Sequence, residues 1–165
     1  MTTPEKDLRP TALWKSMTDG QRQAAATAFW ADDESLAEQT EVMLLLSRKL
    51  NFRYKSVELM SPERKVAHLL KFAGISEGVA GRLLVTYHLA TQRKMMGDFL
   101  DQIGIAHEDG LIAADDVPKP DSAKLEAAAK ALVAAYPAED VRLYFATLTM
   151  QDPETWGQLD QYAPA

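Results

Sequence analysis

Signals that start an α-helix recur along the whole sequence, and they constrain the fold more than any other feature. Residues Thr18 to Gln21 have the pattern of a capping box, in which two side chains three positions apart cap each other's backbone N–H groups. Ser61-Pro62 places a capping serine before a proline at the first helical position. Further starts are indicated at Ser76, Asp121 or Ser122, Pro137 and Asp152. Because strand signals do not recur in this way, the sequence predicts an all-α protein.

The apolar stripes that follow these starts predict an irregular bundle of about eight short helices. The expected bounds are 10–17, 18–31, 34–50, 61–74, 77–103 with a break near 91–94, 121–136, 137–151, and a short helix after Asp152. Short connections favour antiparallel neighbours in such a bundle. The alternative is solenoid-like packing of helix pairs, because residues 87–102 and 144–161 both begin with tyrosine and end in Leu-Asp-Gln.

The length of the chain fits a single domain over 1–165, with residues 1–9 as a flexible N-terminal tail. A chain of 165 residues lies within the usual size of one domain and can bury a core without disulfides. Its content of 47% hydrophobic and 25% charged residues is ordinary for a globular protein.

The longest apolar run, Val42 to Leu46, is expected to lie at the centre of the core. Five consecutive helical residues point in all directions, and a helix that is apolar all round is typically a buried one. Leu45, near the middle of the run, is therefore predicted to be almost fully buried.

The composition limits the cellular compartment in which the protein is expected and the classes of partner that it can bind. The sequence contains no cysteine, which excludes disulfides, thiolate nucleophiles and cysteine zinc sites. The N-terminus lacks the apolar segment of a secretory signal, and no apolar run approaches the ~20 residues that span a bilayer. We therefore expect a cytoplasmic protein with no membrane partner. An acidic net charge of −6 also argues against a nucleic-acid partner.

The candidate catalytic residues are His88 and the group formed by His107, Glu108 and Asp109. An imidazole and two carboxylates in a turn could act as acid and base or hold a metal, if partners come from elsewhere in the fold. No histidine has a second ligand one helical turn away, so we expect no metal and no cofactor. The simpler interpretations are a core-edge histidine with one hydrogen bond for His88, and a solvated turn closed by Gly110.

Charge is unevenly distributed along the chain. Residues 48–71 contain seven bases and two acids, a net charge of +5, whereas residues 98–165 contain thirteen acids and four bases, a net charge of −9. Arg48, Arg53 and Arg64 in the basic segment are candidates for binding a small anion. Solvated, interspersed charges are the simpler interpretation.

These observations favour a non-catalytic role. The leading hypothesis is a protein–protein interaction or scaffold module that self-associates, because no catalytic signature is present and the charges are asymmetric. Adjacent residues on a helix cannot both face one core, so Met95 and Met96, together with Trp30 and Trp156, are candidates for an exposed apolar surface. The alternatives are an enzyme assembled around His88 and His107, and a helical protein that binds a small anion.

Overall fold

The computed structural model describes residues 7–113 and 117–164, and 75% of the chain is helical. The described residues form α1 (Pro10–Ser16), α2 (Asp19–Ala31), α3 (Leu36–Leu50), α4 (Tyr54–Glu58), α5 (Pro62–Lys71), α6 (Glu77–Thr91), α7 (Arg93–Gln102), α8 (Ser122–Ala135), α9 (Ala138–Gln151) and α10 (Pro153–Trp156). Two 3-10 helices, η1 (Asp33–Ser35) and η2 (Gly157–Tyr162), and one hairpin of β1 (His107–Glu108) and β2 (Leu111–Ile112) complete this part of the chain. The predicted all-α fold is confirmed.

Most helices begin where their capping residues indicate. The Thr18 hydroxyl accepts from the Gln21 N–H, and the Gln21 side-chain oxygen accepts from the Thr18 N–H, so the capping box forms in full. At the start of α5, α6, α8 and α10, the side chain of the N-cap residue accepts a hydrogen bond from the backbone N–H three residues further on. These N-cap residues are Ser61, Ser76, Asp121 and Asp152. The break expected near 91–94 separates α6 from α7.

Two elements depart from the sequence prediction. The stretch 51–60 was expected to be only a connection, but it contains α4 after Asn51 ends α3 in the left-handed conformation, with φ of 54°. The His107 turn is a β-hairpin, in which both central residues, Asp109 and Gly110, have positive φ. This is the turn geometry that matches the twist of two antiparallel strands.

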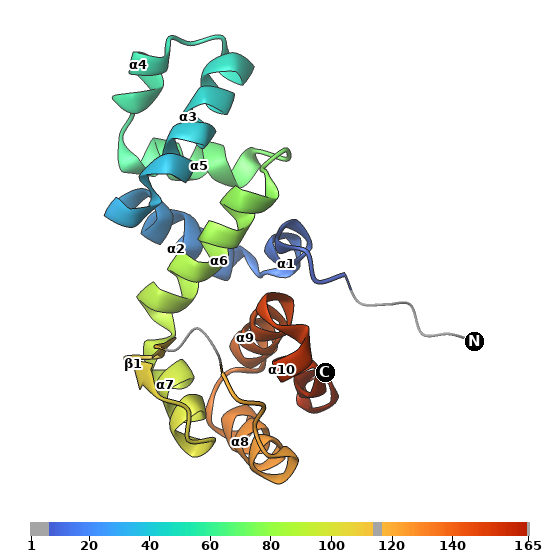
Figure 1. The fold of residues 1–165 in the computed structure, drawn as a ribbon. Helices are drawn as coiled ribbons and strands as arrows, with labels where there is room; N and C mark the ends of the chain where they lie inside the picture. The colour runs from blue at the N-terminus through green and yellow to red at the C-terminus, as the bar shows by residue number, and fades with distance from the viewer. Residues whose placement is uncertain (1–6, 114–116, 165) are drawn as a thin grey trace, which may run out of the picture.

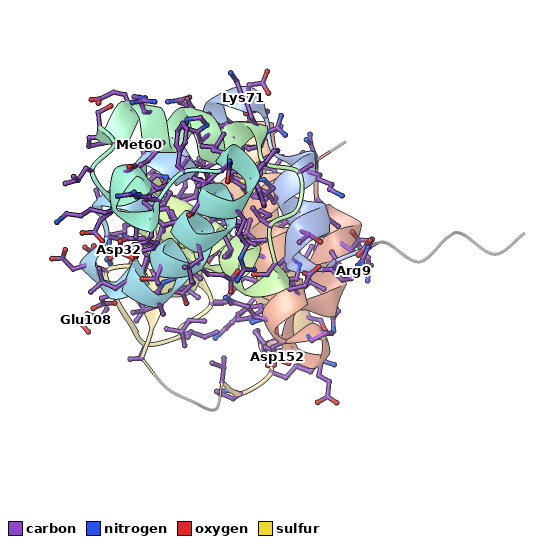
Figure 2. The ribbon with its side chains drawn as sticks, turned by 90° about the horizontal axis from the view of Figure 1, so that it is seen from above. Arg9, Asp32, Met60, Lys71, Glu108 and Asp152 are labelled. Atoms are coloured by element: carbon purple, nitrogen blue, oxygen red, sulfur yellow. The ribbon has the colours of Figure 1, made fainter. Side chains whose placement is uncertain are left out.

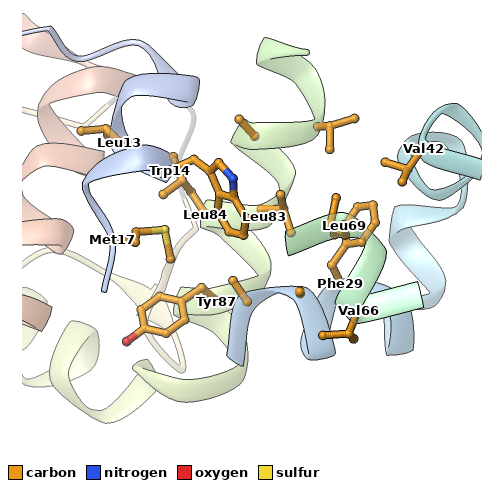
Figure 3. Packing of buried hydrophobic residues seen from close by; sticks show 14 of the residues in the cluster. Leu13, Trp14, Met17, Phe29, Val42, Val66, Leu69, Leu83, Leu84 and Tyr87 are labelled. Carbon is orange, nitrogen blue, oxygen red and sulfur yellow. The ribbon is translucent and has the colours of Figure 1, made fainter. Parts of the chain in front are cut away.

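The buried side chains form two hydrophobic clusters, one at each end of the molecule (Figure 1). The N-terminal cluster is built mainly from α1 to α6, and Phe29, Leu69, Leu83 and Leu84 are fully buried at its centre (Figure 3). The C-terminal cluster is built from α7 to η2 around three aromatic rings and a leucine: Phe99, Phe145, Trp156 and Leu132.

Helices α6 and α9 belong to both clusters. Along α6, Tyr87 packs in the N-terminal cluster and Leu89 packs against the C-terminal one. Along α9, Leu143 belongs to the N-terminal cluster and Tyr144 to the C-terminal one. We call the zone where these two helices pass from one cluster to the other the seam.

Contacts of α1 with both α6 and α9 link distant parts of the chain. This is a property of a bundle, whereas repeats in a solenoid contact only their neighbours.

The prediction that the run Val42 to Leu46 lies at the centre of the core is wrong. Val42, Met43 and Leu46 are buried, but Leu44 is 45% exposed and Leu45 is only partly buried. Helix α3 lies at one end of the molecule, where neighbouring helices cover one of its sides (Figure 1). The run therefore places apolar side chains on all sides of α3, although the outer side of this helix is exposed to solvent.

This difference within one run gives a matched pair of substitutions. Leu46→Asp is expected to unfold the protein, because an unpaired charge at a site that is 1% exposed costs several kcal/mol against a total stability of about 5–15 kcal/mol. Leu44→Asp, two residues away and exposed, is expected to lower the melting temperature by no more than a few degrees. Circular dichroism melts check both, and similar losses in the two variants would contradict the packing of α3.

Candidate functional site

A cavity of about 230 Å³ opens at the seam, between α6, α7, the hairpin and α9. Its lining is mainly apolar and includes no Lys, Arg, Asp or Glu side chain. The residues that line it are Val85, His88 and Leu89 of α6, Met96 of α7, Gly110, Leu111 and Ile112 of the hairpin, and Tyr144, Thr147, Leu148 and Gln151 of α9. Ligand sites in proteins have this character, with carbon walls and a few placed polar groups.

His88, one of the residues that line this pocket, has a buried polar atom without a partner among the described residues. Its side chain is almost fully buried, with 4% exposure, and Nδ1 lies 2.8 Å from the carbonyl oxygen of Leu84. A carbonyl only accepts, so Nδ1 carries the proton of the neutral ring and Nε2 presents a lone pair. That buried Nε2 has no hydrogen-bond partner among the described residues. Burial also lowers the pKa of His88 to about 4, so the ring is neutral at physiological pH.

Tyr144 faces His88 across the seam, and the two ring centroids are 5.8 Å apart. The Tyr144 hydroxyl forms no hydrogen bond with any residue of 7–113 or 117–164. Burial raises the pKa of this phenol, so the hydroxyl stays protonated and can donate or accept. Two residues that line the pocket therefore carry a polar group, an acceptor on His88 and a hydroxyl on Tyr144, whose bonding capacity the described residues do not use.

A polar network beside the pocket ties α6 to α9 and α2. The Tyr87 hydroxyl donates to Asp140 Oδ1 over 2.7 Å, and Gln21 Nε2 donates to the same oxygen over 3.0 Å. Gln92 Nε2 donates to the Tyr87 oxygen over 3.2 Å. Burial, followed by the bond to Asp140, raises the pKa of Tyr87 to about 12. These bonds fix the spacing of the two helices that form opposite walls of the pocket.

His107 holds the hairpin against α7. The Gly110 N–H donates to His107 Nδ1 over 2.9 Å, so the neutral ring carries its proton on Nε2, which lies 2.6 Å from Asp101 Oδ1. Arg93 adds a bond of 3.0 Å from Nη1 to the carbonyl oxygen of Asp109. Both nitrogens of His107 are thus occupied in positioning the hairpin, and neither is free to act as a base.

Gly110 is required at this turn for two reasons. Its φ of +91° is a conformation that residues with a side chain rarely adopt. A Cβ atom at this position would also lie 2.9 Å from the carbonyl oxygen of Arg93. The close approach lets the hairpin cover Met96, which lines the pocket beneath it.

The structure does not bring the predicted catalytic residues together. His88 lines the pocket, whereas His107 bonds to Asp101 and Gly110. Glu108 is exposed on the hairpin, and the Asp109 carboxylate lies 3.9 Å from Arg93 Nη1. Within the described ranges, no three His, Asp or Glu side chains are grouped so that they could hold a metal ion.

The other predicted surface residues fall into two groups. Arg48, Arg53 and Arg64 are exposed around α3, α4 and α5 and do not line the pocket. The expectation of an exposed surface at Met95, Met96 and Trp156 is wrong, because all three are buried. Both methionines belong to the C-terminal cluster, and Met96 also lies against Gly110 of the hairpin. Trp30 is partly buried, and Lys65 Nζ lies 5.5 Å from the centre of its ring.

Sequence reasoning missed Tyr144 and the hairpin residues of the pocket. Tyr144 lies on an ordinary apolar stripe, and nothing in its spacing distinguishes it from a core residue. The hairpin did carry a signal, because Asp-Gly between short β-prone segments is typical of a two-residue turn. The pocket itself depends on how α6 and α9 meet, which no local pattern encodes.

Comparison with known proteins adds no functional information. The chain matches no protein-family model, and neither the curated proteins nor the solved structures contain a significant match to it. In the part of the chain that the structure describes, no helix is both long and apolar enough to cross a bilayer. The pocket at the seam is therefore the feature of the molecule that bears on function.

The burial of His88 predicts a pH-dependent stability. Its folded pKa of about 4 lies below the ordinary 6.5, so the unfolded chain binds the proton more tightly. The contribution of the neutral ring is complete above about pH 6.5 and is lost as the pH falls toward 4, by about 3 kcal/mol in total. The free energy of unfolding is measured by urea unfolding of wild type and His88→Phe across this pH range. It should fall less steeply with decreasing pH in the variant than in the wild type. Tyr144→Phe, which removes no group that titrates there, should keep the wild-type slope. The same change of unfolding free energy with pH in wild type and His88→Phe would contradict the assignment of a buried, neutral His88.

Proposed function

We propose that this protein binds a small, neutral and mainly apolar molecule that carries a hydrogen-bond donor. The observation that carries the proposal is the buried Nε2 of His88, an acceptor without a partner among the described residues, on a residue that lines the apolar seam pocket. A buried polar atom without a hydrogen bond destabilises a protein by about 1–3 kcal/mol. A donor on a ligand would remove that penalty.

The chemistry of the pocket favours a neutral ligand. No cationic side chain lines the cavity, and His88 is uncharged because burial lowers its pKa to about 4. An anion would lose its hydration without gaining a counter-charge. The arginines of the sequence-based alternative, Arg48, Arg53 and Arg64, do not line this pocket. Tyr144 offers a hydroxyl for a second hydrogen bond, so an aromatic alcohol or an N–H heterocycle fits both groups.

The volume limits the size of the ligand. A dry cavity of about 150 Å³ accepts benzene in a protein core, so about 230 Å³ suits a molecule of one or two rings. A nucleotide or a long acyl chain exceeds this space. The interaction role predicted from the sequence has less support, because Met95, Met96 and Trp156 are buried and leave no apolar surface of the predicted kind.

Indole and indene form a matched pair of probes, because they have the same shape and only indole carries an N–H donor. Indole is expected to bind about tenfold more tightly than indene, a difference of about 1.4 kcal/mol for one hydrogen bond to a buried acceptor. Binding is measured by NMR titration, in which resonances of Val85, Leu89 and Tyr144 should shift.

Two variants separate the roles in that experiment. His88→Phe should lose the preference for indole over indene, because the imidazole acceptor is gone while a ring still occupies the site. His68→Phe, the same change on α5 outside the pocket lining, should retain the preference of the wild type. Equal affinity of the wild type for indole and indene, or shifts confined to other parts of the chain, would contradict the proposal.

A further inference from the structure

The end of the molecule formed by α3, α4 and the start of α5 combines exposed bases with exposed apolar side chains. We call this end the basic tip and define it by its exposed residues Arg48, Lys49, Phe52, Arg53, Lys55, Leu59 and Arg64. It projects at the top of Figure 1, and Figure 2, which looks down on it, shows long side chains extending outward around α3 and α4.

The bases of the tip are not neutralised by the protein. None of Arg48, Lys49, Arg53, Lys55 and Arg64 lies within ion-pair distance of a described carboxylate. Some bases elsewhere do have such partners, with 2.6 Å between Arg22 and Asp19 and 2.8 Å between Lys130 and Glu126. The same end also exposes Glu58 and Glu63, so its five bases and two acids give a net charge of +3, a positive field that is available to an external anionic surface.

Two large apolar side chains stand among these bases. Phe52 lies in the turn before α4 and is 44% exposed, and Leu59 lies in the turn after α4 and is 72% exposed. Between and beside them, Val57 and Met60 are buried and anchor α4 to the N-terminal cluster. Single exposed apolar residues are common on protein surfaces. Here they occupy the two turns that flank one short anchored helix, at the same end of the molecule as the exposed bases.

The rest of the molecule carries the opposite charge. The segment from residue 98 onward has a net charge of −9 and includes α8, α9 and α10, which lie at the far end from the tip (Figure 1). An anionic surface would repel that end and attract the tip. The charge asymmetry therefore selects a single orientation, with the tip toward the surface.

We propose that the basic tip docks on an anionic lipid surface, with Phe52 and Leu59 entering the interface and the surrounding bases contacting lipid phosphates and carboxylates. Bases near an anionic bilayer and apolar side chains at its boundary act together in peripheral binding. A fluid surface accepts two separate projecting turns without a preformed groove, which favours lipid over an acidic protein. This proposal departs from the sequence-based expectation of no membrane partner, which was drawn from the lack of a spanning segment. The contact uses a folded surface and does not depend on the seam pocket.

Co-sedimentation of the full chain with vesicles tests this proposal. Vesicles of phosphatidylcholine with about a third phosphatidylserine are expected to bind the protein, and pure phosphatidylcholine vesicles are expected to bind at least tenfold less. Binding to the anionic vesicles should fall as salt is raised, because exposed charges are screened. The double variant Arg53→Glu/Lys55→Glu should lose binding at least tenfold, and Phe52→Ser/Leu59→Ser should weaken it severalfold.

Matched controls use the same changes away from the tip. Lys124→Glu on α8 and Leu36→Ser at the opposite end of α3 alter exposed residues and should bind vesicles as the wild type does. Circular dichroism shows that each variant is folded before it is used. The proposal is overturned if the folded wild type ignores anionic vesicles, or if the tip variants bind like the controls. It is also overturned if light scattering shows salt-sensitive self-association that the tip variants abolish, while vesicles have no effect.

Discussion

The shared use of α6 and α9 by two hydrophobic clusters is the constraint on which the remaining structure depends. Each helix must present apolar residues to the N-terminal cluster on one side and to the C-terminal cluster on the other, as Tyr87 and Leu89 do on α6. His88 lies between them and is buried by the packing of its neighbours. The bond from the Tyr87 hydroxyl to Asp140 then sets the distance between the two helices.

This arrangement provides the pocket on which the proposed binding function is based. The seam leaves space where the two clusters do not meet, and the hairpin covers that space because Gly110 permits a close approach to α7. In the proposed function, carbon walls would select the size and shape of the ligand, while His88 Nε2 and the Tyr144 hydroxyl would select its hydrogen-bonding groups. The charges that dominate the sequence lie elsewhere on the molecule and are available for a different role at the basic tip.

Much of the secondary structure could be predicted from local chemistry, and the tertiary features could not. Capping residues such as Thr18 and Ser61 act within one helical turn, so their consequences are visible in the sequence. The position of Leu45 depends on which side of α3 other helices cover, and the burial of Met96 depends on the hairpin. The sequence indicated His88 as a core-edge histidine with one hydrogen bond, which agrees with the bond to Leu84. It gave no sign that Tyr144 lies opposite.

The most direct test of the central claim is the ¹⁵N NMR spectrum of the His88 ring at neutral pH, with and without indole. In the free protein, Nδ1 should have the shift of a protonated nitrogen and Nε2 that of an unprotonated one, because Leu84 accepts the Nδ1 proton. Saturation with indole should move the Nε2 resonance toward that of a hydrogen-bonded acceptor and leave Nδ1 nearly unchanged. A ring protonated on Nε2, or an Nε2 resonance that does not respond to indole, would contradict the account.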